Sequence, residues 1–461
     1  IIFVYCKSLN VEEPARQYEQ ISPGPDYEAG EEEKPLPAFY GEPVPDDDDI
    51  IIEGTKRKSN LRKNVVQEEE PIPGDENVEI DFSLYLDNAD LHIKASENNN
   101  FLIDPDNGDG FALMWGGARS NFGIEVPEDS NGFPKVAFQA KIKEFLPIIH
   151  LPFEELDPHD IRVGWSLGST SNILGESPHS FGYSSLARKA VNSIFTDYGE
   201  PFHINDVITS VLDLEKSEIS YYKNEQFLGV AFSDLGLSSG DVIFPHICTK
   251  NCKVEVNFGD ALTLLKSDSS EESNLKYING LDRKFLIRGP VAPSSKSDCT
   301  VLMMVGLPGV GKSTWVRQYL RDHPHEQWTL LSTDIIISAM KVNGIARSKG
   351  RWDMIMGLTA KAMNRSLHLA CRRRRNYIID QTNVSKEARR RKLSQFKDFQ
   401  VHSFHLLFAS FAIPNIENEP IEGVYFVEPP LERIGEAIEL VNRLALYLPL
   451  AFLLPHYYAC I

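Results

Sequence analysis

The residues with the clearest chemical potential form one glycine-rich stretch at residues 300–314, TVLMMVGLPGVGKST. It contains the spacing G-x-x-x-x-G-K-[ST] between an apolar run that predicts a buried strand and a run that opens a helix. Backbone N–H groups of such a loop point at phosphate oxygens, and the following helix adds positive potential at its N-terminus. Lys312 would reach the β- and γ-phosphates of ATP, and the Ser313 hydroxyl would ligate Mg²⁺. The predicted ATP·Mg²⁺ site comprises Gly306, Pro308, Gly309, Val310, Gly311, Lys312, Ser313 and Thr314.

Strands that alternate with helices follow this loop, and they predict a parallel sheet with its site at the carboxyl ends of the strands. One strand, 376–380, ends in Asp380, which has the usual position of the acid that holds Mg²⁺ through water in phosphate-loop proteins. Another strand, 328–331, which we place beside the loop strand, is followed by Thr333 and Asp334. Asp334 is either a catalytic base toward an attacking hydroxyl or, like Thr333, a helix cap, and both remain open.

Two basic clusters flank the predicted site, at residues 372–375 and 389–392. The second lies on a predicted helix, 385–396, directly after Asp380. Arginines there would close over phosphates or grip a nucleic-acid backbone, whereas the alternative is a solvated helix face. Because the rest of the chain is strongly acidic, we favour a phosphate or RNA contact by Arg389, Arg390 and Arg391.

Composition limits the classes of function. The 461 residues carry a formal net charge of −19, so the whole chain has no basic footprint for nucleic acid, although local patches remain possible. Six cysteines are scattered along the chain, which indicates reduced thiols in an intracellular compartment. Cys248 and Cys252 have no second pair or histidine cluster beside them, so we predict no zinc site. The apolar run at 444–454 is too short and too proline-interrupted for a membrane span.

Residues 1–80 are acidic and proline-rich, and we predict that they are disordered because they cannot bury enough apolar surface to offset their ordering entropy. One basic island, 56–63, is either a nuclear-import signal or a solvated charge run. The chain begins Ile-Ile-Phe without methionine, which we interpret as a fragment or an imperfect gene model.

Residues 81–260 contain short β-rich runs separated by turn signals, which predicts a β-sandwich. No catalytic or metal-binding constellation accompanies these runs, so we expect a binding scaffold with loops at its ends. A polar, turn-rich linker is predicted at 261–299, and the phosphate-loop unit at 300–408.

The β-rich region resembles a SPRY domain, a concanavalin-like sandwich that acts as a non-catalytic protein-interaction module. The matching motifs are RVGWS (162–166), SFGY (180–183), LDL (212–214), YYKNEQFLG (221–229), FPH (244–246) and NFG (257–259). The resemblance implies a protein ligand. Trp165, Tyr183 and Phe258 could be aromatics of the binding surface, but we favour core positions for them because most aromatics of a sandwich are buried.

The combination of this region with the phosphate-loop unit resembles the heterogeneous nuclear ribonucleoprotein U family. The matching motifs are RGP (288–290), MMVGLPG (303–309), KSTW (312–315), GRWD (350–353) and RNYIIDQTNV (375–384). The resemblance covers about 80–405 and implies a nuclear RNA-binding protein, with ATP binding, that acts in pre-mRNA processing and chromatin organisation. The phosphate-loop unit also resembles polynucleotide 5′-kinases, in which an aspartate placed like Asp334 is the base toward the 5′-hydroxyl and a lid supplies arginines.

The chain also departs from that family. Nothing matches its N-terminal DNA-binding helix pair or its Arg-Gly-Gly-rich tail, and residues 409–461 leave the pattern, so we interpret this tail as aberrant and expect the sheet to lack its last strands and lid. Three hypotheses follow: a nuclear RNA-binding regulator that uses nucleotide binding, a polynucleotide 5′-kinase, and an interaction protein whose working part is the SPRY region. We favour the first, with catalysis and the oligomeric state left open.

Overall fold

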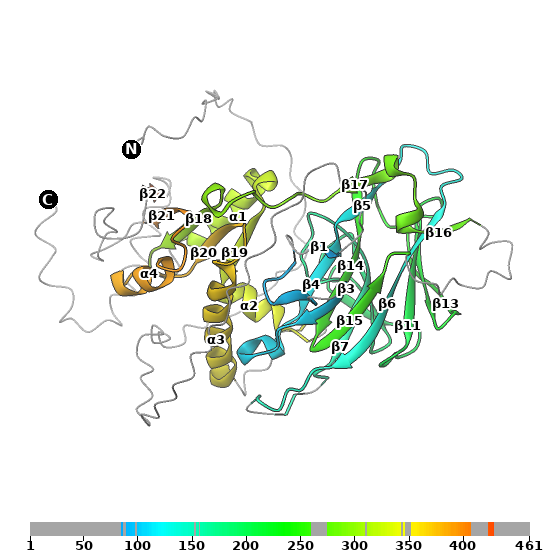
Figure 1. Ribbon diagram of the computed structural model, residues 1–461, viewed down its shortest axis with the longest axis horizontal. Coiled ribbons are helices and arrows are strands. Elements are labelled where there is room, and N and C mark those ends of the chain that lie inside the picture. The colour runs from blue at the N-terminus through cyan, green and yellow to red at the C-terminus, as the bar shows by residue number, and fades with distance from the viewer. Residues whose placement is uncertain are drawn as a thin grey trace, which may run out of the picture. The chain divides into compact units, whose positions relative to one another are not determined.

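The β-rich region folds as two mainly antiparallel sheets, and a third, parallel sheet follows it in the chain (Figure 1). The computed structural model describes residues 84–85, 89–96, 99–151, 154–155, 157–259, 274–308, 311–342, 344–345, 352–406 and 423–427. The predicted disorder of 1–80, the basic island at 56–63, and Gly309 and Val310 of the loop lie outside these residues.

The first sheet of the sandwich is antiparallel throughout. Its strand order is β1 (Leu84–Tyr85), β4 (Gly116–Ser120), β14 (Val242–Lys250), β7 (Asp160–Leu167), β8 (Ser180–Ser184), β9 (Arg188–Val191) and β10 (Ile194–Asp197). Two more strands join it off this path: β5 (Phe122–Glu125) pairs with β14, and β17 (Leu286–Arg288) pairs with β5.

The second sheet faces the first across the core. Its order is β13 (Gln226–Ser233), β12 (Glu218–Lys223), β11 (Val207–Asp213), β6 (Lys135–Phe145), β15 (Cys252–Asn257), β3 (Asn99–Pro105) and β2 (Ile93–Ser96). A short strand, β16 (Leu275–Tyr277), adds to β6 in parallel. Strand β11 lies inside the sheet and is buried from Ile208 to Asp213, and its Ile208 and Leu212 belong to the hydrophobic core.

The aromatic residues singled out in the sandwich are core residues. Trp165, Tyr183 and Phe258 are each at most 1% exposed. Trp165 packs edge-on against Phe138 at 5.2 Å and donates its indole N–H to Ser210 Oγ at 2.9 Å. The core interpretation is therefore confirmed for these three residues.

The third sheet is parallel, in the order β19 (Trp328–Ser332), β20 (Asn376–Asp380), β18 (Thr300–Val305), β21 (Gln400–Leu406) and β22 (Gly423–Val427). The helices are α1 (Lys312–Asp322), α2 (Thr333–Ala339), α3 (Trp352–Ala370) and α4 (Lys386–Leu393). Alternate residues of β18 pack on opposite sides: Leu302 and Met304 lie with Val316 of α1, whereas Met303 lies with residues of α2 and α3. The predicted sandwich followed by a parallel-sheet α/β domain is confirmed.

Three sequence expectations about this region need correction. The strand that precedes Asp334 does not neighbour the loop strand, because β20 lies between β19 and β18. The predicted linker 261–299 contains β16 and β17, as well as short 3₁₀ helices at 278–280, 283–285 and 296–298, and its residues Ile278, Leu281 and Leu286 belong to the sandwich core. The supposedly aberrant tail supplies β22, which pairs in parallel with β21, so the sheet does continue past residue 408.

The sandwich has its own hydrophobic core, and a second cluster joins its outer side to the parallel sheet. Both belong to the same compact unit of the chain, 64–461. A 3₁₀ helix, η2 (Asp109–Leu113), precedes β4 and packs against α3. The cluster under the parallel sheet includes Leu91, Phe111, Leu113 and Met114 from the sandwich side, together with Met303, Ile355, Leu358, Ala362 and Tyr377. The parallel-sheet domain is therefore covered on one face by residues that precede it by about 200 positions.

Candidate nucleotide-binding site

The glycine-rich loop connects β18 to α1, as the motif requires. Gly306 donates its N–H to the carbonyl of Thr382 at 2.9 Å, which ties the start of the loop to the segment that follows β20. Gly311 is the N-cap of α1 with φ +95° and ψ 10°, a left-handed conformation that favours glycine. The first amide groups of α1 have no partner within the helix and are therefore available to an anion at this end.

Lys312 is held against the loop. Its side chain is buried, and Nζ donates to the carbonyl oxygens of Gly306 and Leu307 at 2.9 and 2.7 Å. Burial lowers the pKa of the Lys312 ammonium group, and the nearby Asp380 carboxylate opposes that shift. The ammonium group is thus placed directly on the loop that would wrap the phosphates.

Ser313 and Asp380 meet at the carboxyl edge of the sheet. Ser313 Oγ donates to Asp380 Oδ2 at 2.6 Å, although 67 residues separate them in the chain. Asp380 is the last residue of β20 and is buried, and the strand register places it opposite Ser332 of β19. A hydroxyl and a carboxylate oxygen at one point are the hard ligands that Mg²⁺ takes, and they commonly accompany waters and phosphate oxygens. The residues present therefore fit a magnesium ion.

Asp334 lies in the first turn of α2 with an exposed side chain. The helix cap is Ser332, whose hydroxyl accepts the N–H of Asp334 at 3.2 Å. The interpretation of Thr333 or Asp334 as the cap is therefore wrong; Thr333 instead accepts a hydrogen bond from Gln381 Nε2 at 3.3 Å. The Asp334 carboxylate is left at the surface one strand away from Asp380.

The predicted phosphate-contacting arginines of the basic helix α4 differ in their exposure to solvent. Arg389 is fully buried, and its Nη1 donates to the carbonyls of Asn383 and Val384 at 3.1 and 2.9 Å. Arg389 therefore supports the loop after β20 from a buried position, and its predicted contact with phosphate or RNA stays a prediction. Arg390 and Arg391 are exposed, and their contact with phosphate or RNA stays a prediction.

The cluster at 372–375 holds the two parts of the chain together and does not surround the phosphate loop. Arg373 and Arg375 donate to the carbonyls of Ile93 and Ala89, at 3.3 and 2.7 Å, on the sandwich side. Arg374 donates to the carbonyl of Pro293 at 2.9 Å. Sequence reasoning missed this role because a run of arginines has the same composition whether it meets phosphates or backbone carbonyls.

The two cysteines of the sandwich are both buried thiols. Cys248 lies on β14 and Cys252 begins β15, and burial raises the pKa of each. Within the described ranges, no three His, Cys, Asp or Glu side chains are grouped as a metal site. No helix in the described part of the chain is long and apolar enough to cross a membrane.

The fold and the site define a chain that joins a sandwich to a phosphate-loop domain, and comparison with known domain families gives the same division. Residues 148–261 match the SPRY domain and residues 301–411 match an AAA domain, a class with a nucleotide-binding loop. A solved SPRY domain, that of human HERC1, is similar with a TM-score of 0.29 and 16% identity, over 38% of this chain and 97% of that chain.

Whole proteins are similar over longer stretches. Heterogeneous nuclear ribonucleoprotein U-like protein 2 of Mus musculus is 32% identical over 320 residues, which is 68% of this chain and 41% of that protein; the Homo sapiens protein has the same values. ATP-dependent RNA helicase Ddx1 of Drosophila melanogaster is 40% identical over 98 residues, 21% of this chain and 14% of that protein. The chain thus spans about two fifths of the length of the U-like proteins that it matches.

Proposed function

We propose that this chain is an RNA-binding ribonucleoprotein that binds ATP·Mg²⁺ through its phosphate loop and a protein ligand through its SPRY sandwich. The observation that carries the nucleotide part is the 2.6 Å contact between Ser313 Oγ and Asp380 Oδ2 beside the loop-bound Lys312. The RNA part is supported by the names of the similar proteins, a nuclear ribonucleoprotein and an RNA helicase. A nuclear location and roles in pre-mRNA processing and chromatin organisation belong to the same proposal.

In this proposal, different residues bind the phosphates and the magnesium ion. The backbone of 306–311 and the amino end of α1 would take the phosphates, with Thr314 in the first turn of that helix. Lys312 would exchange its two carbonyl partners for phosphate oxygens, which are stronger acceptors for an ammonium group. Ser313 and Asp380 would hold Mg²⁺, Asp380 through water; the ion supplies positive charge that neutralises the phosphates when bound.

A second candidate function is phosphoryl transfer to a polynucleotide 5′-hydroxyl, and the position of Asp334 favours it. The cap of α2 is Ser332, so the Asp334 carboxylate is not needed to start the helix and faces solvent. A general base must reach the proton that it removes, and an exposed carboxylate at this edge of the sheet can approach an incoming hydroxyl. The role of Arg390 and Arg391 in closing over the phosphates would serve either function.

Both candidates are tested on the whole chain, because the parallel-sheet domain borrows part of its core from the sandwich. We would measure ATP·Mg²⁺ binding by calorimetry and 5′-phosphoryl transfer to an RNA and a DNA oligonucleotide with free 5′-hydroxyls. Lys312→Ala and Asp380→Asn should each weaken nucleotide binding at least tenfold, or about 1.4 kcal/mol. Asp334→Asn should leave that affinity unchanged.

The outcomes separate the hypotheses. Nucleotide binding without transfer supports a ribonucleoprotein in which ATP controls conformation or assembly. Transfer that Asp334→Asn abolishes would make the chain an enzyme and overturn the preferred proposal. Absence of ATP binding in the folded wild-type chain would leave the SPRY sandwich as the working part.

RNA binding is tested separately with the exposed arginines. A double Arg390→Ala/Arg391→Ala variant should bind single-stranded RNA more weakly. The salt dependence of that binding should also fall, because binding with fewer phosphate contacts releases fewer counterions from the RNA. A matched control is Arg317→Ala/Arg321→Ala, which removes two exposed arginines from α1. Equal losses in both variants would refute a specific contact by α4.

A further inference from the structure

The segment that leaves α2 is held by the sandwich at its first residues. Trp115, which directly precedes β4, donates its backbone N–H to the carbonyl of Ala339 at 2.9 Å. Its indole Nε1–H donates to the carbonyl of Lys341 at 3.2 Å. The last carbonyls of a helix lack partners within the helix, so the sandwich supplies part of the C-terminal cap of α2.

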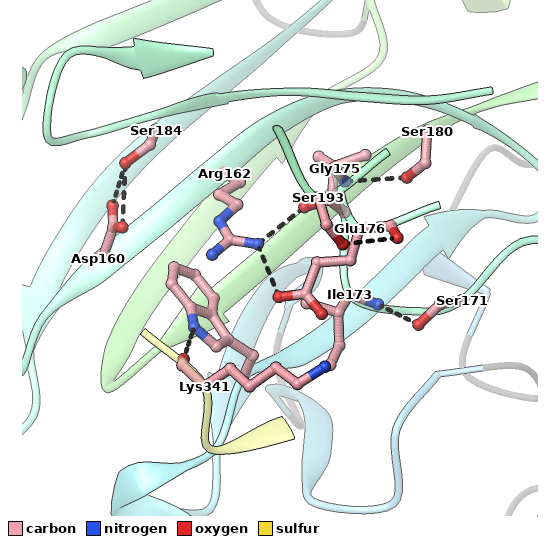
Figure 2. A network of polar contacts seen from close by, with 12 residues as sticks. Asp160, Arg162, Ser171, Ile173, Gly175, Glu176, Ser180, Ser184, Ser193 and Lys341 are labelled. Atoms are coloured by element: carbon pink, nitrogen blue, oxygen red, sulfur yellow. Dashed lines mark hydrogen bonds and ion pairs between the residues drawn. The ribbon is translucent and has the colours of Figure 1, made fainter. Parts of the chain in front are cut away.

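Trp115 is itself fixed by a buried cation. The Arg162 guanidinium lies 4.0 Å from the centre of the Trp115 ring and 4.9 Å from that of Phe195. Figure 2 shows Arg162 directed toward Glu176, with which it forms an ion pair at 3.7 Å, while it also donates to the carbonyl of Leu174 at 2.9 Å. Trp115 is only 2% exposed, and a cation stacked on an aromatic face in such a desolvated place is strongly attracted to it.

Phe195 of the sandwich, which lies beside Arg162, also contacts the turn at 342–345 that follows α2. Val342 and Ile345 form a bridge that closes this turn, and Gly344 has φ +73°. A Cβ atom on Gly344 would lie 2.9 Å from Phe195 Cε2 and 3.3 Å from the carbonyl oxygen of Ser193. Phe195 therefore touches both the Arg162 guanidinium and the turn.

These contacts bear on Asp334, because α2 is short. Its seven residues span about 10 Å, and a helix of that length has little stability of its own. Its amino end is set by β19 and the Ser332 cap, and its carboxyl end is set by Trp115. We propose that Trp115, backed by Arg162 and Phe195, is a positioning residue for α2 and its Asp334, so that the SPRY sandwich completes the acceptor side of the phosphate-loop site.

The inference rests on the proposed function only through Asp334, and its test has a readout that does not need ATP. Amide hydrogen exchange would be measured on the whole chain over residues 333–342. Trp115→Phe keeps the ring beside Arg162 and the backbone bond but removes the indole donor. We expect about fivefold faster exchange in this segment, since one such hydrogen bond contributes on the order of 1 kcal/mol.

The matched control is Trp328→Phe, which removes the indole bond to Glu326 Oε2 at 2.8 Å and should leave 333–342 unchanged. Gly344→Ala changes the contact between the turn and Phe195, and it replaces Trp115→Phe in this test if that variant does not fold. A positioning role also predicts ATP·Mg²⁺ affinity within twofold of wild type and, where transfer occurs, a raised KM for the 5′-hydroxyl acceptor alone. Unchanged amide exchange of 333–342 in both Trp115→Phe and Gly344→Ala would overturn the inference, whether or not ATP binds. An equal rise in exchange throughout the chain would also overturn it.

Discussion

Replacing Gly110 by alanine should destabilise the contact between the sandwich and α3. Gly110 lies in η2, and a Cβ atom at this position would stand 2.0 Å from the carbonyl oxygen of Leu358 and 3.0 Å from Cβ of Ala362. The obstacle is the backbone of a helix, which cannot rotate away as a side chain can. The two elements would have to separate by about 1 Å for the contact to become tolerable.

The expected loss follows from opposing effects. Overpacking costs about 1–3 kcal/mol, and a clash with backbone belongs at the upper end. Alanine also lowers the conformational entropy of the unfolded chain, which by itself would stabilise the folded state by about 0.4–1 kcal/mol. We therefore expect Gly110→Ala to lower the free energy of unfolding by about 2 kcal/mol, which shifts Tm down by about 2–3 °C for a unit as large as 64–461.

The chain contains its own control two residues earlier. At Gly108, the atoms nearest to an added Cβ would belong to the Arg365 guanidinium and the Asp106 carboxylate, the first of each at 3.2 Å, and these side chains can adjust. Gly108→Ala should therefore remain within about 0.5 kcal/mol of wild type. Thermal and urea denaturation of the whole chain would be compared for both variants. If Gly110→Ala is as stable as Gly108→Ala, the packing of η2 on α3 described above is refuted.

Three further predictions concern buried and partly buried polar groups. Arg389→Ala should lower the free energy of unfolding by about 2 kcal/mol, because it strands two buried carbonyl groups, while Arg390→Ala stays within about 0.5; urea denaturation distinguishes them. Although burial raises the pKa of Asp106, a backbone amide and the Arg365 guanidinium hold that pKa below its ordinary value. The ionised form then stabilises the fold above about pH 4 and loses this effect as pH falls through the folded-state pKa, so Asp106→Asn should flatten the acid side of the stability profile. Burial raises the pKa of Cys248 to about 12, so iodoacetamide at pH 8 should modify this thiol only after unfolding, as peptide mass spectrometry would show.

Features that depend on consecutive residues could be predicted from the amino-acid sequence. The loop from Gly306 to Thr314 requires consecutive residues of particular types, and the structure places it between a strand and a helix as expected. The meeting of Ser313 with Asp380 also followed from the sequence, since the carboxyl ends of parallel strands share one edge. The SPRY motifs likewise predicted the sandwich, whose β-rich runs recur at strand length.

The neighbours of each helix and strand could not be predicted in this way, because they depend on contacts between distant parts of the chain. Strand order placed β20 between β19 and β18, and pairing far along the chain brought β16, β17 and β22 into their sheets. The roles of Arg375 and Arg389 were decided in the same way, since an arginine donates equally well to phosphates and to buried carbonyls. The contact of Trp115 with the end of α2 joins residues more than 220 positions apart, and no local pattern specifies such a pairing. The residues just before Trp115 (Phe111, Leu113 and Met114) share a buried apolar cluster with α2 and α3, and burying that cluster brings Trp115 to the end of α2.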